Sequence, residues 1–257
     1  MPREPIGKDR VEGRSRPPRT PRTTARLERP DLPADAEIDL PPRVRKEIDR
    51  LVNDRDRAHD VKVALSLGTV ASEDEDHDAA RRYLAWAKHL APRSTVVREA
   101  LGIALYRAGD LRGALAELQS YRRMSGSNDQ NHLLADCLRA EGREPERAVE
   151  VGLALVEDPT GDIERRVEAA IVVAAVHLDA ERPARAAALL ARFLTGPDRT
   201  DVPSDSTVRL LWVAADAAEA EGKDAEALSA LERLRSIDPD YPDADGRIAL
   251  LRARTGR

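Results

Sequence analysis

A recurring alanine is the feature that most constrains this chain, because it marks a helical repeat. Five alanines stand 34, 34, 38 and 41 residues apart, each within a similar helical pattern: Ala80, Ala114, Ala148, Ala186 and Ala227. A period of this length is typical of stacked helical hairpins, in which each hairpin buries its apolar face only against its neighbours. The spacing therefore predicts an elongated array, a class of protein that works by binding.

Two neighbouring units share one template. The shared positions lie 34 residues apart: Leu67 and Leu101, Gly68 and Gly102, Ala80 and Ala114, and Leu84 and Leu118. Charged residues make up 35% of the chain and aromatic residues only 3%, as expected of closely stacked helices rich in alanine and leucine. Both observations predict an all-α fold.

The periodicity divides the chain into four parts. Residues 1–35 contain seven prolines and little hydrophobic periodicity, so we expect a disordered, basic arm rich in proline and arginine. Residues 36–60 are expected to form an N-terminal capping helix, residues 61–241 the repeat array, and residues 242–257 a C-terminal capping helix. The expected units of the array are about 61–94, 95–128, 128–161, 167–200 and 208–241.

Two glycines carry specific expectations within the units. Gly109 can adopt the left-handed backbone that ends a helix, and Asp110 can cap the helix that follows. Gly152 stands where the other units have leucine. Because a buried leucine contributes about 1.5–3 kcal/mol, the third unit is predicted to be the soft point of the array.

This pattern resembles the tetratricopeptide repeat (TPR) family. Gly102, Gly109, Ala114 and Leu118 match the family's small residue, turn glycine, alanine and large apolar residue, and Pro92 matches its proline. The family's tryptophan is absent from every unit. The resemblance implies a right-handed α-solenoid of about five TPR-like helical hairpins with capping helices. With its basic arm, the layout also resembles TPR proteins of unassigned function from GC-rich bacteria.

The resemblance also implies a non-enzymatic interaction module or scaffold that binds a protein segment in its concave groove. Tyr, Trp and Arg are the residue types that most often anchor a partner. The residues expected to bind this unknown protein or peptide are Tyr106, Arg107, Arg139, Trp212, Glu99 and Arg209. An alternative stays open, in which Tyr106 and Trp212 pack between adjacent units.

The residues of the implied groove indicate which kind of partner segment it binds. Family members that bind a C-terminal carboxylate use Lys and Asn at two positions of the first helix of a unit. At these positions this chain has Leu65 and Thr69 in the first unit, and Glu99 and Ile103 in the second. That clamp is absent. A mixed, somewhat acidic groove favours a partner with basic and apolar groups.

The sequence contains no recognisable catalytic or cofactor-binding constellation. Cys137 is the only cysteine and falls in the middle of a helical pattern, where a small buried residue is expected. None of the five histidines stands in a zinc-binding frame. We therefore expect neither an enzyme nor a cofactor or metal site.

The basic arm supports two further hypotheses. Residues 1–30 carry nine Lys and Arg against four Asp and Glu, a net charge of +5. Because the whole chain has a net charge of −5, the remaining residues carry a net charge of −10. The arm could make weak contact with nucleic acid, which would make the chain a nucleic-acid-associated adaptor. Alternatively, the opposite charges could hold the arm in the groove as a lid.

The sequence also predicts a location. Residues 1–10 are charged and contain prolines, unlike the apolar core of a secretion signal. The longest apolar run, residues 169–176, is far shorter than the ~20 residues that cross a bilayer. We expect a cytoplasmic protein without membrane contact.

Overall fold

The chain folds into helices that pack in sequence order. The structure is a computed structural model that describes residues 27–142, 145–196 and 204–256, and this part of the chain contains twelve helices and no strand. The helices are α1 (Pro42–Leu51), α2 (Arg55–Glu73), α3 (His77–Leu90), α4 (Thr95–Arg107), α5 (Leu111–Ser125), α6 (Asn131–Glu141), α7 (Pro145–Val156), α8 (Ile163–Asp179), α9 (Pro183–Leu194), α10 (Ser204–Ala220), α11 (Asp224–Ile237) and α12 (Ala244–Thr255). The predicted all-α class is confirmed.

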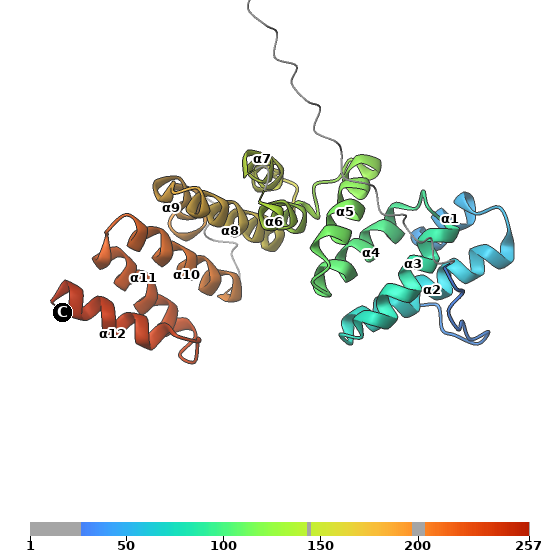
Figure 1. Cartoon of the computed structure of the whole chain (residues 1–257), viewed down its shortest axis with the longest axis horizontal. Helices are drawn as coiled ribbons and strands as arrows, with labels where there is room; N and C mark the ends of the chain where they lie inside the picture. The colour runs from blue at the N-terminus through green and yellow to red at the C-terminus, as the bar shows by residue number, and fades with distance from the viewer. Residues whose placement is uncertain (1–26, 143–144, 197–203, 257) are drawn as a thin grey trace, which may run out of the picture.

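The helices form antiparallel pairs that follow one another along an arch (Figure 1). The pairs are α2/α3, α4/α5, α6/α7, α8/α9 and α10/α11, and the second helix of each pair also contacts the first helix of the next. The first helices α2, α4, α6, α8 and α10 touch one another in turn, and we call their shared surface the first-helix face. The surface formed by α3, α5, α7, α9 and α11 is the second-helix face.

Local signals set the ends of these helices. Gly109 has a φ of 75° after α4, and the Asp110 carboxylate accepts a hydrogen bond from the Gly113 amide at 2.9 Å to begin α5, so both turn predictions are confirmed. Helix α2 begins at Arg55, before the expected unit boundary at residue 61, because the Asp54 carboxylate accepts hydrogen bonds from two backbone amides.

Residues 27–41 lie along helix α2 instead of leaving the body directly. Arg29 forms two hydrogen bonds to the Asp60 carboxylate, each 2.9 Å long. The backbone amide of Asp39 donates to the Ser66 hydroxyl at 3.1 Å. Part of the predicted arm, residues 27–35, therefore contacts the helical body, whereas residues 1–26 lie outside the described residues.

The buried apolar side chains form two clusters that meet in α7. Val151 belongs to the N-terminal cluster with Ile48, whereas Leu155, one turn later, belongs to the C-terminal cluster with Phe193. Each cluster spans several helical pairs. The core therefore extends along the array, as expected when each pair is buried by its neighbours.

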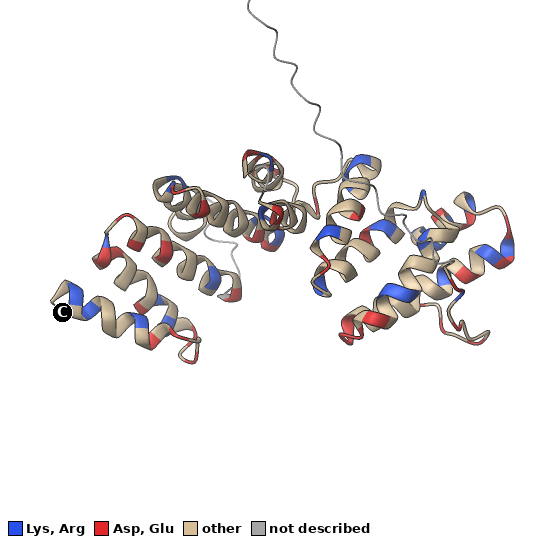
Figure 2. Ribbon diagram, in the orientation of Figure 1, with Lys and Arg blue, Asp and Glu red and all other residues tan. Residues whose placement is uncertain are grey.

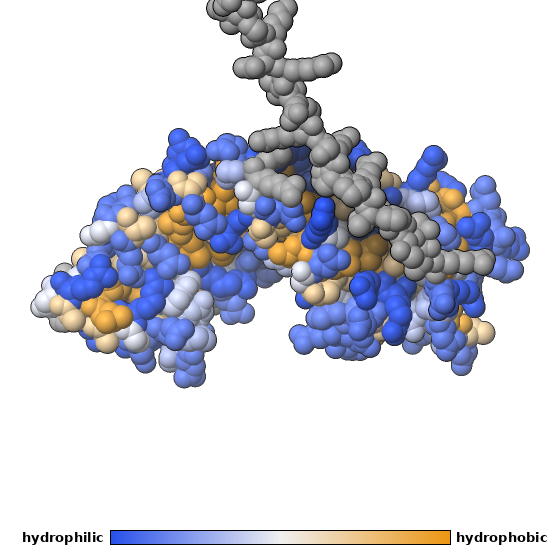
Figure 3. Space-filling view, viewed as in Figure 1, coloured by the Kyte–Doolittle hydropathy of each residue, from blue (hydrophilic) through white to orange (hydrophobic). Residues whose placement is uncertain are grey.

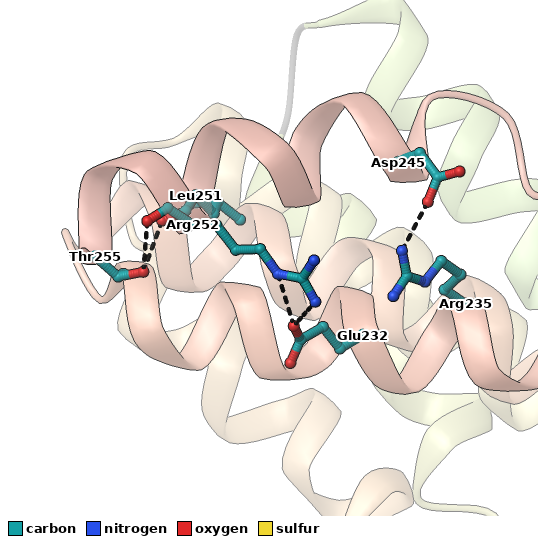
Figure 4. A network of polar contacts seen from close by, with 6 residues as sticks. All are labelled: Glu232, Arg235, Asp245, Leu251, Arg252 and Thr255. Carbon is teal, nitrogen blue, oxygen red and sulfur yellow. Dashed lines mark hydrogen bonds and ion pairs between the residues drawn. The ribbon is translucent and has the colours of Figure 1, made fainter. Parts of the chain in front are cut away.

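Helix α12 closes the C-terminal end through polar contacts with α11 (Figure 4). Arg252 donates two hydrogen bonds to Glu232, of 3.2 and 2.6 Å, and Arg235 donates one to Asp245 at 3.0 Å. The inward side of α12 is apolar, with Ile248 buried. These contacts give the last helical pair a polar outer cover, which is the physical role expected of a capping helix.

Small residues allow the helices of a pair to approach closely. A Cβ atom at Gly68 would lie 2.6 Å from Cγ of Leu84, and one at Gly102 would lie 2.8 Å from Cδ2 of Leu118. Such distances are shorter than a carbon–carbon contact. Each glycine therefore lets its first helix rest directly on the leucine of the second helix.

Gly152 is also closely packed, so the missing contact from which a soft point in the third unit was predicted is not present. A Cβ atom at Gly152 would lie 2.3 Å from Cγ2 of Val173, which belongs to α8, and 3.6 Å from Cβ of Ala135. Val173 is fully buried. The next helical pair thus fills the space that a leucine fills in the other units.

Replacing Gly152 with alanine should destabilise the protein by roughly 1–2 kcal/mol, because the steric cost of the added methyl exceeds the gain in helix propensity. Gly246→Ala in α12 is the matched control, since a Cβ atom there meets nothing within 4 Å. Urea denaturation of both variants and the wild type measures the difference. If Gly152→Ala were as stable as Gly246→Ala, the tight α7–α8 contact would be contradicted.

Candidate functional site

A hollow lies on the first-helix face between α2 and α4, and we call it the first-helix groove. Its volume is about 400 Å³, and Leu40, Leu65, Ala100 and Ile103 form an apolar floor. Asp39, Pro41, Arg43 and Val44 form one wall beside Leu40, and this wall was not predicted from the sequence. The apolar Leu40 ahead of the Pro41-Pro42 helix start was the only signal for this wall.

Charged side chains of both signs surround the apolar floor. The rim carries Asp39, Arg43, Glu73, Glu99 and Arg107. Lys and Arg alternate with Asp and Glu along the array in Figure 2, and apolar surface appears in Figure 3 as patches between hydrophilic side chains. The groove thus combines an apolar centre with charges that could orient a ligand.

Two of the predicted binding residues converge on Asp136 in α6. The Tyr106 hydroxyl donates to Oδ2 of Asp136 at 2.7 Å, and Nη1 of Arg139 lies 3.5 Å from Oδ1 of the same carboxylate. Arg139 also donates to Asp179 at 2.7 Å. Burial and the hydrogen bond to Asp136 raise the pKa of Tyr106, which keeps the hydroxyl protonated as a donor. Together these side chains connect α4, α6 and α8.

Glu99 and Arg107 lie at the groove and also contact neighbouring helices. The Gln130 side chain, just before α6, donates to Oε1 of Glu99 at 2.8 Å. Arg107 donates from Nη1 to the backbone carbonyl of Ser72 in α2 at 3.2 Å. These are the predicted binding residues that line the first-helix groove.

The remaining predicted residues lie on α10, toward the C-terminal end. Arg209 forms an ion pair with Glu168 of α8. The Arg247 guanidinium lies 4.3 Å from the centre of the Trp212 ring, and the Tyr241 ring centre lies 5.1 Å from it. Trp212 of α10 therefore packs against the chain that follows α11, and the choice between this packing and partner binding stays open.

The predicted binding residues other than Trp212 thus contact an adjacent repeat unit. They bridge side chains 30 to 41 positions apart, for example Tyr106 and Asp136 or Arg209 and Glu168. Their role in partner binding stays a prediction, and the structure gives them a second role in holding successive pairs together. We call these contacts the first-helix bridges.

Cys137 and the metal-ligand residue types are the other features of chemical interest among the described residues. Cys137 is buried, and burial raises the pKa of its thiol to about 12, so the reactive thiolate is disfavoured near neutral pH. Among the described residues, no group of three or more His, Cys, Asp or Glu side chains is placed to hold a metal ion. In the same residues, no helix has the length and apolar character needed to cross a bilayer.

The fold and the groove define an all-α protein built as a helical-repeat array. A scan against protein-family models found no match, and a search of the curated proteins found no match either. The relationship to the TPR family therefore stays a prediction that the geometry of the helical pairs must support.

Trp212→Ala should lower stability by about 1–3 kcal/mol, because it removes the ring contacts with Arg247 and Tyr241. The amides of α12 should lose protection first in hydrogen exchange. Arg209→Ala on the same helix is the control and should cost under about 1 kcal/mol, since its side chain is exposed. Unchanged stability of Trp212→Ala would show that the ring is free for a partner.

Acid should weaken the fold through His132 in α6. Burial, assisted by the charge of Arg165, lowers the pKa of His132 to about 4 in the folded protein, whereas an unfolded histidine has a pKa near ~6.5. The unfolded chain therefore binds more protons between these values, so stability falls as pH falls through this window. Between pH 7 and pH 5 the loss from this group is about 2 kcal/mol.

The measurement is urea denaturation at both pH values for the wild type and His132→Gln. The variant should lose about 2 kcal/mol less on acidification than the wild type. His59→Gln, which alters an exposed histidine of α2, serves as the control. An identical acid sensitivity of all three proteins would contradict the assignment to His132.

Proposed function

We propose that this chain is a non-enzymatic protein–protein interaction module, a right-handed TPR-like solenoid that binds a segment of a partner protein in the first-helix groove. The observation that carries the proposal is the groove's partly buried apolar floor, exemplified by Leu40 and Ile103 within a hollow of about 400 Å³. Such a floor is stabilised further when a ligand removes it from water, by about 25 cal/mol per Å² of apolar surface.

The packing within the helical pairs supports the TPR part of the proposal. The glycine of each of two first helices rests on the leucine sixteen residues later, as in Gly68 with Leu84 and Gly102 with Leu118. First helices contact one another along the array, and second helices contact the next first helix. This is the arrangement expected of stacked hairpins with a 34-residue template.

The rim of the groove indicates the chemistry of the partner. Its carboxylates belong to Asp39, Glu73 and Glu99, whereas its cations are Arg43 and Arg107. Since the excess is negative, the preferred segment carries an apolar side chain flanked by basic residues. This agrees with the partner expected from the sequence.

Ile103→Glu should reduce partner binding at least about tenfold, because it buries an unpaired charge against the ligand. Leu250→Glu is the matched control, since Leu250 in α12 is 67% exposed and lies far along the chain from the groove. Partners captured from native lysate with the wild type are identified, and their binding to each variant is titrated. Equal binding by both variants would remove the groove from the function.

The nucleic-acid alternative depends on the basic arm, of which residues 1–26 lie outside the described residues. The same capture is repeated after nuclease treatment and with a chain that begins at Leu27, which retains the Arg29 contact with Asp60. Binding that is insensitive to both changes supports the groove. Loss of binding on nuclease treatment supports the adaptor hypothesis, and tighter binding without the arm supports the lid.

A further inference from the structure

A second hollow lies on the second-helix face, between α5 and α7 and above α6. This second-helix groove has a volume of about 570 Å³. Its apolar base is formed by Leu134 and Val151, which are buried, and by the partly exposed Leu138 of α6. Its charged side chains are all cations, contributed by Arg122, Arg123 and Arg147.

The positive charge of this groove is not balanced within its lining. Among the described residues, no carboxylate lines this groove, and neither Arg122 nor Arg123 takes part in an ion pair within the same part of the chain. Arg147 pairs with Glu150 one turn away on its own helix, at 2.9 Å. The groove therefore presents guanidinium groups beside apolar surface, a combination suited to a ligand with carboxylates.

Helix electrostatics explain only part of this arrangement. Arg122 and Arg123 lie in the last turn of α5, where a helix dipole favours cations. Arg147, however, lies in the first turn of α7, where the same dipole disfavours a positive charge. The three arginines thus come together at one groove although the helix ends that carry them have opposite preferences.

A groove elsewhere on the same face provides an internal comparison. The hollow between α9 and α11, of about 320 Å³, has a similar apolar base, but Glu221, Glu226 and Arg233 provide its charges. Packing of helical pairs therefore creates such hollows without requiring a group of three cations. The arginines of the second-helix groove are a property of this site.

We propose that the second-helix groove binds a short acidic segment of a partner protein, with its carboxylates on Arg122, Arg123 and Arg147 and an apolar side chain against Leu138. A short segment suits the site better than nucleic acid does. Residues 31–257 carry a net charge of −10, which repels a long polyanion but matters little to a few carboxylates that contact the arginines directly.

The test uses the full chain and a fluorescent peptide in which glutamates flank a single leucine. Fluorescence anisotropy should show binding that weakens with added salt, and the double variant Arg122→Glu/Arg123→Glu should weaken it at least about tenfold. Arg112→Glu, an exposed arginine of α5 that does not line the groove, should bind within about twofold of the wild type. Circular dichroism melting verifies that each variant folds.

A single-stranded DNA of similar charge is the competing probe. The proposal is supported if the double variant loses the peptide while DNA fails to displace the peptide from the wild type. It is overturned if the wild type does not bind the peptide, if Arg112→Glu weakens binding as much as the double variant, or if DNA displaces the peptide. Ile103→Glu should leave peptide binding unchanged, which separates this site from the first-helix groove.

Discussion

The structure depends on one steric constraint, the direct contact of a small residue on a first helix with a large apolar residue on its neighbour. A helical pair of this size cannot bury its apolar face alone, so stability grows only as pairs stack. Gly102 on Leu118 fulfils this contact within a pair. In the third pair the small residue is Gly152 on the second helix, and its partner Val173 comes from the following pair. The two arrangements give equivalent packing, but the second makes α7 depend on α8 for its burial.

Polar contacts between neighbouring helical pairs supplement this apolar packing. The first helices are joined by contacts such as Tyr106 with Asp136 and Arg139 with Asp179. A related device lies inside the array, where the largely buried Glu117 carboxylate of α5 accepts from Lys88 of α3 and Arg98 of α4. Breaking such a buried pair by removing one partner leaves an unpaired charge and is strongly destabilising. Aromatic and arginine side chains on the first-helix face contact neighbouring helices, so a loss of binding on their mutation must be separated from a loss of stability.

The repeat units and their ends were readable from the sequence because they depend on residues close together in the chain. The alanine spacing located the helical pairs, and Gly109 with Asp110 located a turn that the structure confirms. The first-helix groove could not be predicted from the sequence, since its wall at residues 39–44 meets α4 only after folding. Gly152 was misread because its packing partner belongs to the next pair. The cluster of Arg122, Arg123 and Arg147 was hidden by the abundance of arginine, which supplies most of the chain's 42 cationic residues.

The α4/α5 pair connects the two proposed sites. Ile103 and Arg107 of α4 face the first-helix groove, whereas Arg122 and Arg123 of α5 face the second-helix groove. The contact of Gly102 with Leu118 holds these two helices together. A ligand in either groove binds only the folded pair and so stabilises it by mass action. Because such linkage is reciprocal, each ligand would stabilise the same folded state that the other ligand binds. A basic segment on one face and an acidic segment on the other would then bind to opposite sides of the α4/α5 pair, together with its neighbouring helices, without competing for the same charges.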